Sequence, residues 1–152
     1  MSDPRKTAIV TGASQGIGAG IVKALVERGF NVVANSRQMT RSTEVTASNR
    51  VALVDGHIGE PATAARVVQT ALDRFGSIDA LVNNAGIFFT KPFTSYTAED
   101  FKALVSTNVE GFLYVTQLAI KQMLAQKTGG SIVTITRPLP ATRSGVSRRR
   151  CR

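Results

Sequence analysis

A glycine-rich stretch near residue 12 has the residue types and spacing to bind an anion. It separates a short β-branched run at 7–11, typical of a buried strand, from a segment at 17–28 whose apolar residues recur at helical spacing. Gly12 permits a tight turn, Gly16 lets phosphates approach the backbone, and Gly18 lets helix and strand pack closely. The amides and the dipole of the helix N-terminus then attract the anion. We therefore predict that a dinucleotide pyrophosphate binds at Thr11-Gly12-Ala13-Ser14-Gln15-Gly16-Ile17-Gly18.

A second stretch leads to the same interpretation. The glycines are spaced G-x3-G-x-G, which resembles the short-chain dehydrogenase/reductase family, and residues 79–86 (DALVNNAG) resemble that family's fourth strand and its N-N-A-G signature. The small residues Ala85 and Gly86 leave room for a nucleotide over the backbone. We expect the Asn83 amide to tie neighbouring strand ends together. A glycine-rich turn without a ligand is the alternative for each stretch.

The resemblance implies an oxidoreductase that transfers a hydride between a nicotinamide cofactor and a small-molecule carbonyl or alcohol. In the family, a carboxylate at the end of the second strand selects NAD, whereas this chain has Ser36 and Arg37 there. Ser36 can donate to a 2′-phosphate and Arg37 can pair with it, so NADP is favoured over NAD. A solvated loop charge is the alternative for Arg37. Asp55, followed by Gly56, resembles the family residue that binds adenine, or the two form a simple turn.

The catalytic residues of the family are largely missing from the sequence. The family's proton donor is a tyrosine whose pKa is lowered by a lysine four positions later. Neither Tyr96 nor Tyr114 has that lysine, and Arg137 stands where the catalytic serine should follow the fifth strand. Asn108 matches the family's catalytic asparagine, which would kink its helix, although a purely structural bend is an equal alternative. The resemblance therefore implies an inactive chain, with a non-catalytic NADP(H)-binding module as the alternative function.

Strands and helices alternate in the order that builds a doubly wound parallel sheet. We expect further strands at 31–35, 51–54, 80–82 and 131–136, helices at 61–75 and 97–126, and a bend near 106–108. Crossovers of this length are right-handed, so helices cover both faces of a Rossmann-like α/β sheet and ligands bind at the carboxyl strand ends. At 152 residues, we expect this fold to be incomplete at its C-terminus.

The last predicted helix carries more apolar surface than one sheet face can cover. We therefore expect the chain to be prone to aggregation and only marginally stable. The apolar residues are Phe112, Leu113, Val115, Leu118, Ala119, Ile120, Met123 and Leu124.

Basic charge is concentrated at the C-terminal end. The formal net charge is +9, and residues 137–152 hold six of the 19 Lys and Arg residues but none of the 10 Asp and Glu residues. We divide the chain into a nucleotide-binding domain at 1–136 and a basic, disordered tail at 137–152, which arose by a change of reading frame or is a genuine tail. Arginines without aromatic residues indicate only weak, nonspecific nucleic-acid binding, so a nucleic-acid binder is the least favoured function.

Composition restricts the remaining functions. No apolar run approaches the roughly 18 residues of a membrane span, and no signal peptide fits before the first strand, so we expect a cytoplasmic chain without membrane contact. The only cysteine, Cys151, excludes an internal disulfide. We expect no metal site and interpret the single histidine, His57, as a loop histidine. The resemblance implies homo-oligomers, an expectation that we do not extend to this chain.

Overall fold

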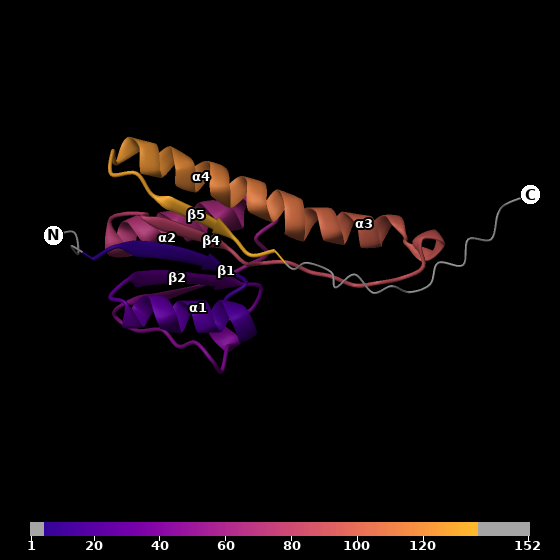
Figure 1. Ribbon diagram of the computed structural model, residues 1–152, viewed down its shortest axis with the longest axis horizontal. Coiled ribbons are helices and arrows are strands. Elements are labelled where there is room, and N and C mark those ends of the chain that lie inside the picture. Colours follow the sequence, from indigo (N-terminus) through magenta and orange to yellow (C-terminus); the bar gives the residue numbers. More distant parts are fainter. Residues whose placement is uncertain (1–4, 137–152) are drawn as a thin grey trace, which may run out of the picture.

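Five parallel strands form the centre of the computed structural model, which describes residues 5–136 (Figure 1). The strand order is β3-β2-β1-β4-β5, and every neighbouring pair is parallel. The strands are β1 (Thr7–Thr11), β2 (Asn31–Ser36), β3 (Val51–Asp55), β4 (Ala80–Asn83) and β5 (Ser131–Thr134). This arrangement confirms the predicted Rossmann-like α/β sheet. The basic tail predicted at 137–152 lies outside the described residues.

The strand ends differ slightly from the predicted ones because pairing partners set them. β2 and β3 each extend one residue further than expected, since Ser36 pairs with Asp55. β5 stops at Thr134, two residues early, because its partner β4 ends at Asn83. β1 is buried along its whole length. Its continuous run of apolar and β-branched residues is typical of a central strand in a parallel sheet, which is covered on both faces.

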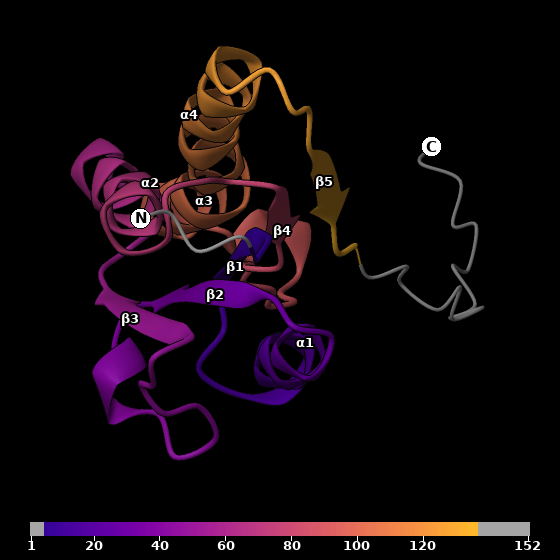
Figure 2. The ribbon, with the colours of Figure 1, turned by 90° about the vertical axis from the view of Figure 1, so that its left-hand side faces the viewer.

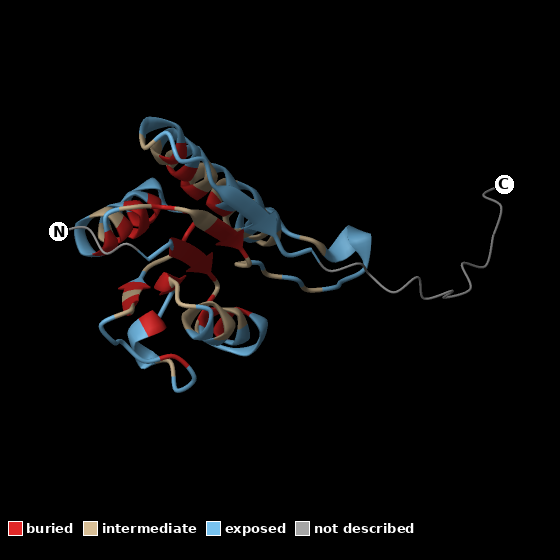
Figure 3. Cartoon of the chain, turned by 60° about the vertical axis from the view of Figure 1, so that its left-hand side comes forward, coloured by how far each residue is buried: buried red, intermediate tan, exposed pale blue. Residues whose placement is uncertain are grey.

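Helices cover both faces of the sheet (Figure 2). α1 (Gly16–Glu27) lies on one face, and α2 (Pro61–Phe75) and α4 (Gly111–Ala125) lie on the other. Two apolar clusters fill these layers, one between α1 and the sheet and one beneath α2 and α4 (Figure 3). α2 has the predicted bounds because Pro61 suits the first turn and Gly76, at φ 84°, ends the helix in a left-handed conformation.

A long helical segment runs from α3 (Ala98–Val105) through η3 (Ser106–Glu110) into α4 (Figure 1). Thr97 and Asp100 form a capping box at its start. The bend predicted near 106–108 is a π-helical turn, η3, a feature frequent at functional sites. Among the described residues, no helix combines the length and apolar character that a membrane span needs.

The segment at 37–50, which we call the β2–β3 connection, contains no α-helix. Its only regular element is the short 3-10 turn η1 (Met39–Arg41). Met39 and Val45 are buried in the same apolar cluster as residues of α1. These two side chains therefore cover the part of the sheet that a crossover helix usually covers. A second 3-10 turn, η2 (Phe93–Ser95), lies in the loop after β4.

Candidate functional site

The glycine-rich loop between β1 and α1 has the geometry of a backbone anion site. Gly12 and Gly16 adopt φ values of 64° and 57°, a region that favours glycine. A side chain added at Gly16 would meet no atom within 4 Å, so the space above this residue is open. α1 begins at Gly16, and no acidic residue lies in its first turn. The Gly16 amide donates a long hydrogen bond of 3.4 Å to the Glu44 carboxylate of the β2–β3 connection. The positive dipole end of α1 therefore has one carboxylate beside it and open space at the Gly16 Cα.

Gly18 is needed for close packing, but its neighbours differ from those predicted. A Cβ at Gly18 would overlap the Gly12 carbonyl oxygen and lie 2.9 Å from the Ala13 Cα. It would also lie 2.7 Å from the Asn84 Nδ2. The missing side chain thus lets α1 pack against the glycine-rich loop itself, rather than only against the strand.

The prediction that Asn83 ties neighbouring strand ends together is wrong. The Asn83 amide donates to Thr116 Oγ1 of α4 at 3.0 Å. The next residue, Asn84, makes the cross-strand link, since its Nδ2 donates to the carbonyls of Thr11 and Gly12 at 3.1 and 3.0 Å. The amides of Asn84 and Ala85 also donate to Thr11 Oγ1. These bonds hold the carboxyl ends of β1 and β4 side by side.

The side-chain amide of Asn108 forms two hydrogen bonds with the backbone of one residue, Ile87. Its Nδ2 donates to the Ile87 carbonyl at 3.0 Å, and its Oδ1 accepts from the Ile87 amide at 2.9 Å. The π-helical turn η3 is therefore fastened to the loop after β4. This geometry agrees with a structural bend, and the catalytic role of Asn108 stays a prediction.

Eight of the predicted cofactor-binding residues line one pocket of about 200 Å³ at the carboxyl ends of the strands. Parallel sheets bind ligands at this edge. The eight are Gly12, Ser14, Gln15, Ser36, Arg37, Gly56, Ala85 and Gly86. Residues far apart in the sequence are thus brought together as the motifs predict.

Asp55 does not line this pocket. Its carboxylate accepts hydrogen bonds from the hydroxyl and the amide of Thr40, at 2.6 and 2.8 Å. These two bonds hold the pKa of the Asp55 carboxyl below its usual 3.8. The predicted contact of Asp55 with adenine stays a prediction, while the Gly56 backbone beside it does reach the pocket.

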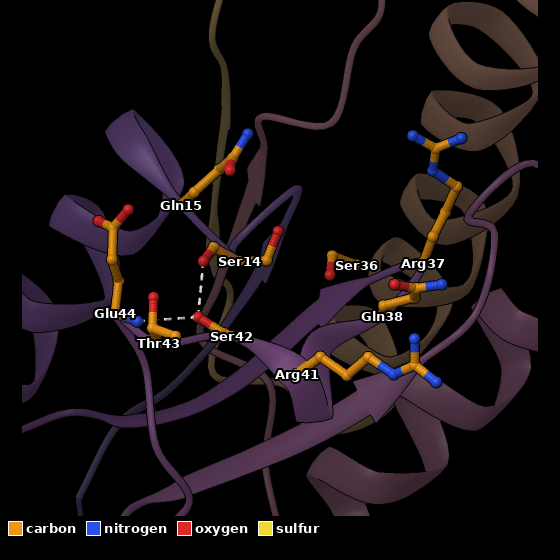
Figure 4. Close-up of a pocket in the computed structure, with 9 residues that line it drawn as sticks. All are labelled: Ser14, Gln15, Ser36, Arg37, Gln38, Arg41, Ser42, Thr43 and Glu44. Carbon is orange, nitrogen blue, oxygen red and sulfur yellow. Dashed lines mark hydrogen bonds between the residues drawn. The ribbon is translucent and has the colours of Figure 1, made fainter.

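A larger pocket of about 530 Å³ shares part of its lining with the first. Figure 4 shows the residues that line this larger pocket. Both pockets are lined by Ser14, Gln15, Ser36 and Arg37. The β2–β3 connection supplies the rest of the lining, namely Gln38, Arg41, Ser42, Thr43 and Glu44. This pocket is lined only by polar and charged side chains and therefore suits a charged group.

A third pocket, of about 780 Å³, is also lined by the loop after β4. Ala85, Gly86 and Ile87 line both this pocket and the 200 Å³ pocket, so an elongated molecule can pass over them from one to the other. The predicted site residues Ile17, Asn83 and Asn108 lie here.

Sequence reasoning missed a histidine–hydroxyl pair in the 200 Å³ pocket. His57 lies in a loop, as predicted, but it also lines the pocket with Thr107. Its Nδ1 accepts from the Gly59 amide at 3.1 Å, so in the neutral ring Nε2 carries the proton and donates to Thr107 Oγ1 at 3.2 Å. No local sequence pattern predicts this pair, because His57 and Thr107 are 50 positions apart.

The arrangement has the open space and polar groups that a dinucleotide needs. The open space at Gly16 admits a phosphate beside the α1 amides. Ser14 and Ser36 supply hydroxyls, and the Arg37 guanidinium has no hydrogen bond or ion pair with any residue at 5–136. The three pockets share lining residues and can together hold an elongated molecule, with the polar 530 Å³ pocket at one end.

Comparisons with known proteins agree with this geometry. A solved 3-ketoacyl-(acyl-carrier-protein) reductase from Brucella melitensis, complexed with NADH, has a TM-score of 0.79 and 30% identity; the match covers 85% of this chain and 55% of that one. A sorbitol dehydrogenase from Cereibacter sphaeroides is 34% identical, with 86% of this chain and 52% of the relative covered. A 3-oxoacyl-[acyl-carrier-protein] reductase from Synechocystis is also 34% identical, with 86% and 55% covered.

The chain spans about half the length of the curated relatives that it matches. The family model described as short chain dehydrogenase matches residues 6–139, which include every described strand and helix. The chain therefore belongs to the short-chain dehydrogenase family, whose members are oxidoreductases that bind NAD(P).

Proposed function

We propose that this chain binds NADP(H) in preference to NAD(H), as the cofactor-binding part of a short-chain oxidoreductase. The observation that carries the proposal is at the end of β2, where Ser36 and Arg37 line a polar pocket. The Arg37 guanidinium has no hydrogen-bond or ion-pair partner among residues 5–136. A carboxylate there would repel a 2′-phosphate, whereas a serine hydroxyl and an arginine bind it.

Several of the predicted residues then have a role along the dinucleotide. The backbone at Gly16 and Ile17 faces the pyrophosphate, and Ala85 and Gly86 border the passage between the two pockets. Asn108 holds the loop after β4 in place. The nicotinamide, when bound, would supply the hydride that the family transfers.

We also propose that the 152-residue chain does not reduce carbonyl compounds. The Tyr96 hydroxyl donates to the Phe89 carbonyl at 2.9 Å, and Tyr114 packs against the apolar cluster under α4. Neither lies four positions before a lysine. Loss of a general acid costs about 10²–10⁴ in rate. We expect no NADPH oxidation above background with a panel of ketones, and turnover that is abolished by Gly16→Asp would refute this proposal.

Calorimetric titration of the full chain with NADPH and NADH tests the cofactor preference. We expect Arg37→Ala to weaken NADPH binding by about 1.5 to 3 kcal/mol, the range of a charged hydrogen bond, and to leave NADH binding unchanged. Arg28→Ala is the matched control, because Arg28 is exposed near the far end of α1 and bonds to the Ala24 carbonyl. Equal losses for both nucleotides would contradict the role of Arg37.

A further inference from the structure

The turn between β3 and α2, residues 56–60, is closed by the side chain of His57. The Gly59 amide donates to the ring at Nδ1, at 3.1 Å, and the Glu60 amide donates to the His57 carbonyl at 3.0 Å. A ring nitrogen accepts a hydrogen bond only while it carries no proton. The bond from Gly59 therefore requires the neutral form of His57, with the proton on Nε2.

The opposite nitrogen of the ring links this turn to η3. Nε2 lies 3.2 Å from Thr107 Oγ1, the hydroxyl to which it donates in the neutral form. The two segments are also in close contact, because a Cβ at Gly59 would overlap the carbonyl oxygen and the hydroxyl of Ser106. No space remains there for even one added methyl group, so the turn can move only if its contact with η3 changes.

η3 is also fastened to a second segment, through the residue after Thr107. Asn108 holds the backbone of Ile87 in the loop after β4 by two hydrogen bonds. His57, Ile87 and Thr107 all line the 200 Å³ pocket. Two neighbouring residues of η3 thus hold two segments of that pocket wall, and the His57 ring supplies one of the two links.

We propose that His57 is a positioning residue for nucleotide binding in the 200 Å³ pocket. The neutral ring holds the turn at 56–60 against η3 and so keeps that part of the pocket wall in place. Protonation puts a hydrogen on both ring nitrogens, so that Nδ1 faces the Gly59 amide donor to donor and the bond is lost. The inference rests on the proposed function, because it requires that this pocket binds the nucleotide, but it does not depend on which nucleotide is preferred.

Charged groups lie around the ring, but none of them bonds to it. Asp55 and Glu60 are on either side of His57 in the sequence, Glu110 is in η3, and Arg37 lines the same pocket. Within residues 6–136, the ring has no hydrogen bond or ion pair with any charged side chain. Protonation of the ring therefore removes a hydrogen bond and gains no ion pair in this arrangement.

Protonation of His57 has two effects on nucleotide binding, and their signs are opposite. Release of the turn weakens binding, whereas a positive charge in the pocket attracts the anionic pyrophosphate. The attraction acts between partly exposed charges and is screened by salt, while the loss of the hydrogen bond is not. Binding is therefore measured at about 0.3 M salt, where the Debye length is roughly 6 Å.

Calorimetric titration of the full chain with NAD⁺ at about pH 7.5 and about pH 5.5 tests the proposal, because imidazoles take up a proton in this range. His57 is the only histidine in the sequence. NAD⁺ is chosen because its pyrophosphate does not titrate here, unlike the 2′-phosphate of NADP, whose second pKa is about 6. We expect the affinity to fall by roughly two- to tenfold at the lower pH, the range for the loss of one neutral hydrogen bond.

His57→Asn separates the hydrogen bond from the titration. The asparagine Oδ1 can accept from the Gly59 amide at either pH, because an amide side chain does not titrate. We expect this variant to bind NAD⁺ with affinities that differ by less than about twofold between the two pH values. The matched control combines His57→Asn with Gln69→His, which restores one imidazole at an exposed position on α2. This double variant should be equally insensitive to pH.

A measurement on the free chain tests the ring itself. ¹H–¹⁵N NMR of the imidazole at about pH 7.5 distinguishes the two tautomers of the neutral ring. We expect the Nε2–H tautomer, because Nδ1 accepts from Gly59. The Nδ1–H tautomer would overturn the proposal without any ligand present.

The outcomes distinguish the role of His57 from the proposed cofactor preference. An affinity for NAD⁺ that is unchanged or higher at the lower pH would overturn the role of His57 and leave the preference for NADP(H) intact. Equal weakening of the wild type and of His57→Asn would overturn it as well. If NADPH binds no more tightly than NADH but the pH effect depends on His57, the cofactor preference fails and the role of His57 stands. If the chain, shown by circular dichroism to be folded, binds no dinucleotide at either pH, both fail.

Discussion

At the scale of single residues, the environment of Asp55 depends on Thr40. Asp55 is the last residue of β3, and both hydrogen bonds from Thr40 end on its carboxylate. Thr40 lies between the buried Met39 and the charged Arg41. The carboxylate that the family resemblance assigns to adenine therefore also fixes η1 against the sheet. A nucleotide that contacts the Asp55 carboxylate must therefore share its oxygens with Thr40 or displace the hydrogen bonds from Thr40.

Thr40→Val should raise the pKa of Asp55 toward 3.8, because the Thr40 hydroxyl is the main cause of its low value. A carboxyl with a lowered pKa in the folded state stabilises the fold above its unfolded pKa, and this contribution is lost as the pH falls through the folded value. The variant should therefore lose less stability than the wild type on acidification below about pH 4. Carboxyl ¹³C NMR titration and urea unfolding measure the two effects.

Thr46→Val is the control for this experiment, because Thr46 is exposed and lies in the same connection. It should leave the Asp55 titration unchanged. If Asp55 titrates identically in the wild type and in Thr40→Val, the hydroxyl does not set its pKa.

At the scale of elements, the sequence predicts the strands and helices whose apolar spacing is regular. The alternation of β1, α1 and β2, the bounds of α2 and the bend at η3 all follow from local patterns. The β2–β3 connection does not, because Met39 and Val45 are buried by contacts with distant residues and show no periodicity. The roles of Asn83 and Asn84 could not be predicted from the local sequence either. Which of the two side-chain amides faces β1 and which faces α4 depends on where β4 ends.

Asn84→Ala should destabilise the fold by about 1 to 2 kcal/mol, because it removes two neutral hydrogen bonds that join the ends of β1 and β4. The freed carbonyls of Thr11 and Gly12 lie at the edge of the site, where water can bind them in part. Urea unfolding followed by circular dichroism gives the free energy of unfolding. Asn49→Ala, at an exposed position after β2, should cost less than about 0.5 kcal/mol. Equal costs for the two variants would show that the Asn84 link contributes no stability.

At the scale of the whole molecule, the apolar residues of α4 divide into a covered face and an exposed face. Val115, Ala119 and Met123 are buried against the sheet at a spacing of four residues. Leu124, in contrast, is 72% exposed. The exposed apolar side chains of α4 are Phe112, Leu113, Ile120 and Leu124.

The outer edge of the sheet adds to this surface. β5 pairs only with β4 among the described strands, and its residues are exposed along their whole length. Val133, for example, is 49% exposed. An apolar edge strand beside an apolar helix face is a typical site of self-association.

We therefore expect the purified 152-residue chain to associate at micromolar concentration. Sedimentation velocity should show species larger than the monomer whose fraction grows with concentration, because burial of exposed apolar area is favourable by about 25 cal/mol per Å². Leu124→Lys on α4 and Val133→Lys on β5 should each reduce this fraction, since a charge resists burial at an interface. Lys121→Gln, on the same helix, is the control and should not reduce it. A sample that stays monomeric and unfolds in one cooperative transition, independent of concentration, would show that these exposed faces are not adhesive.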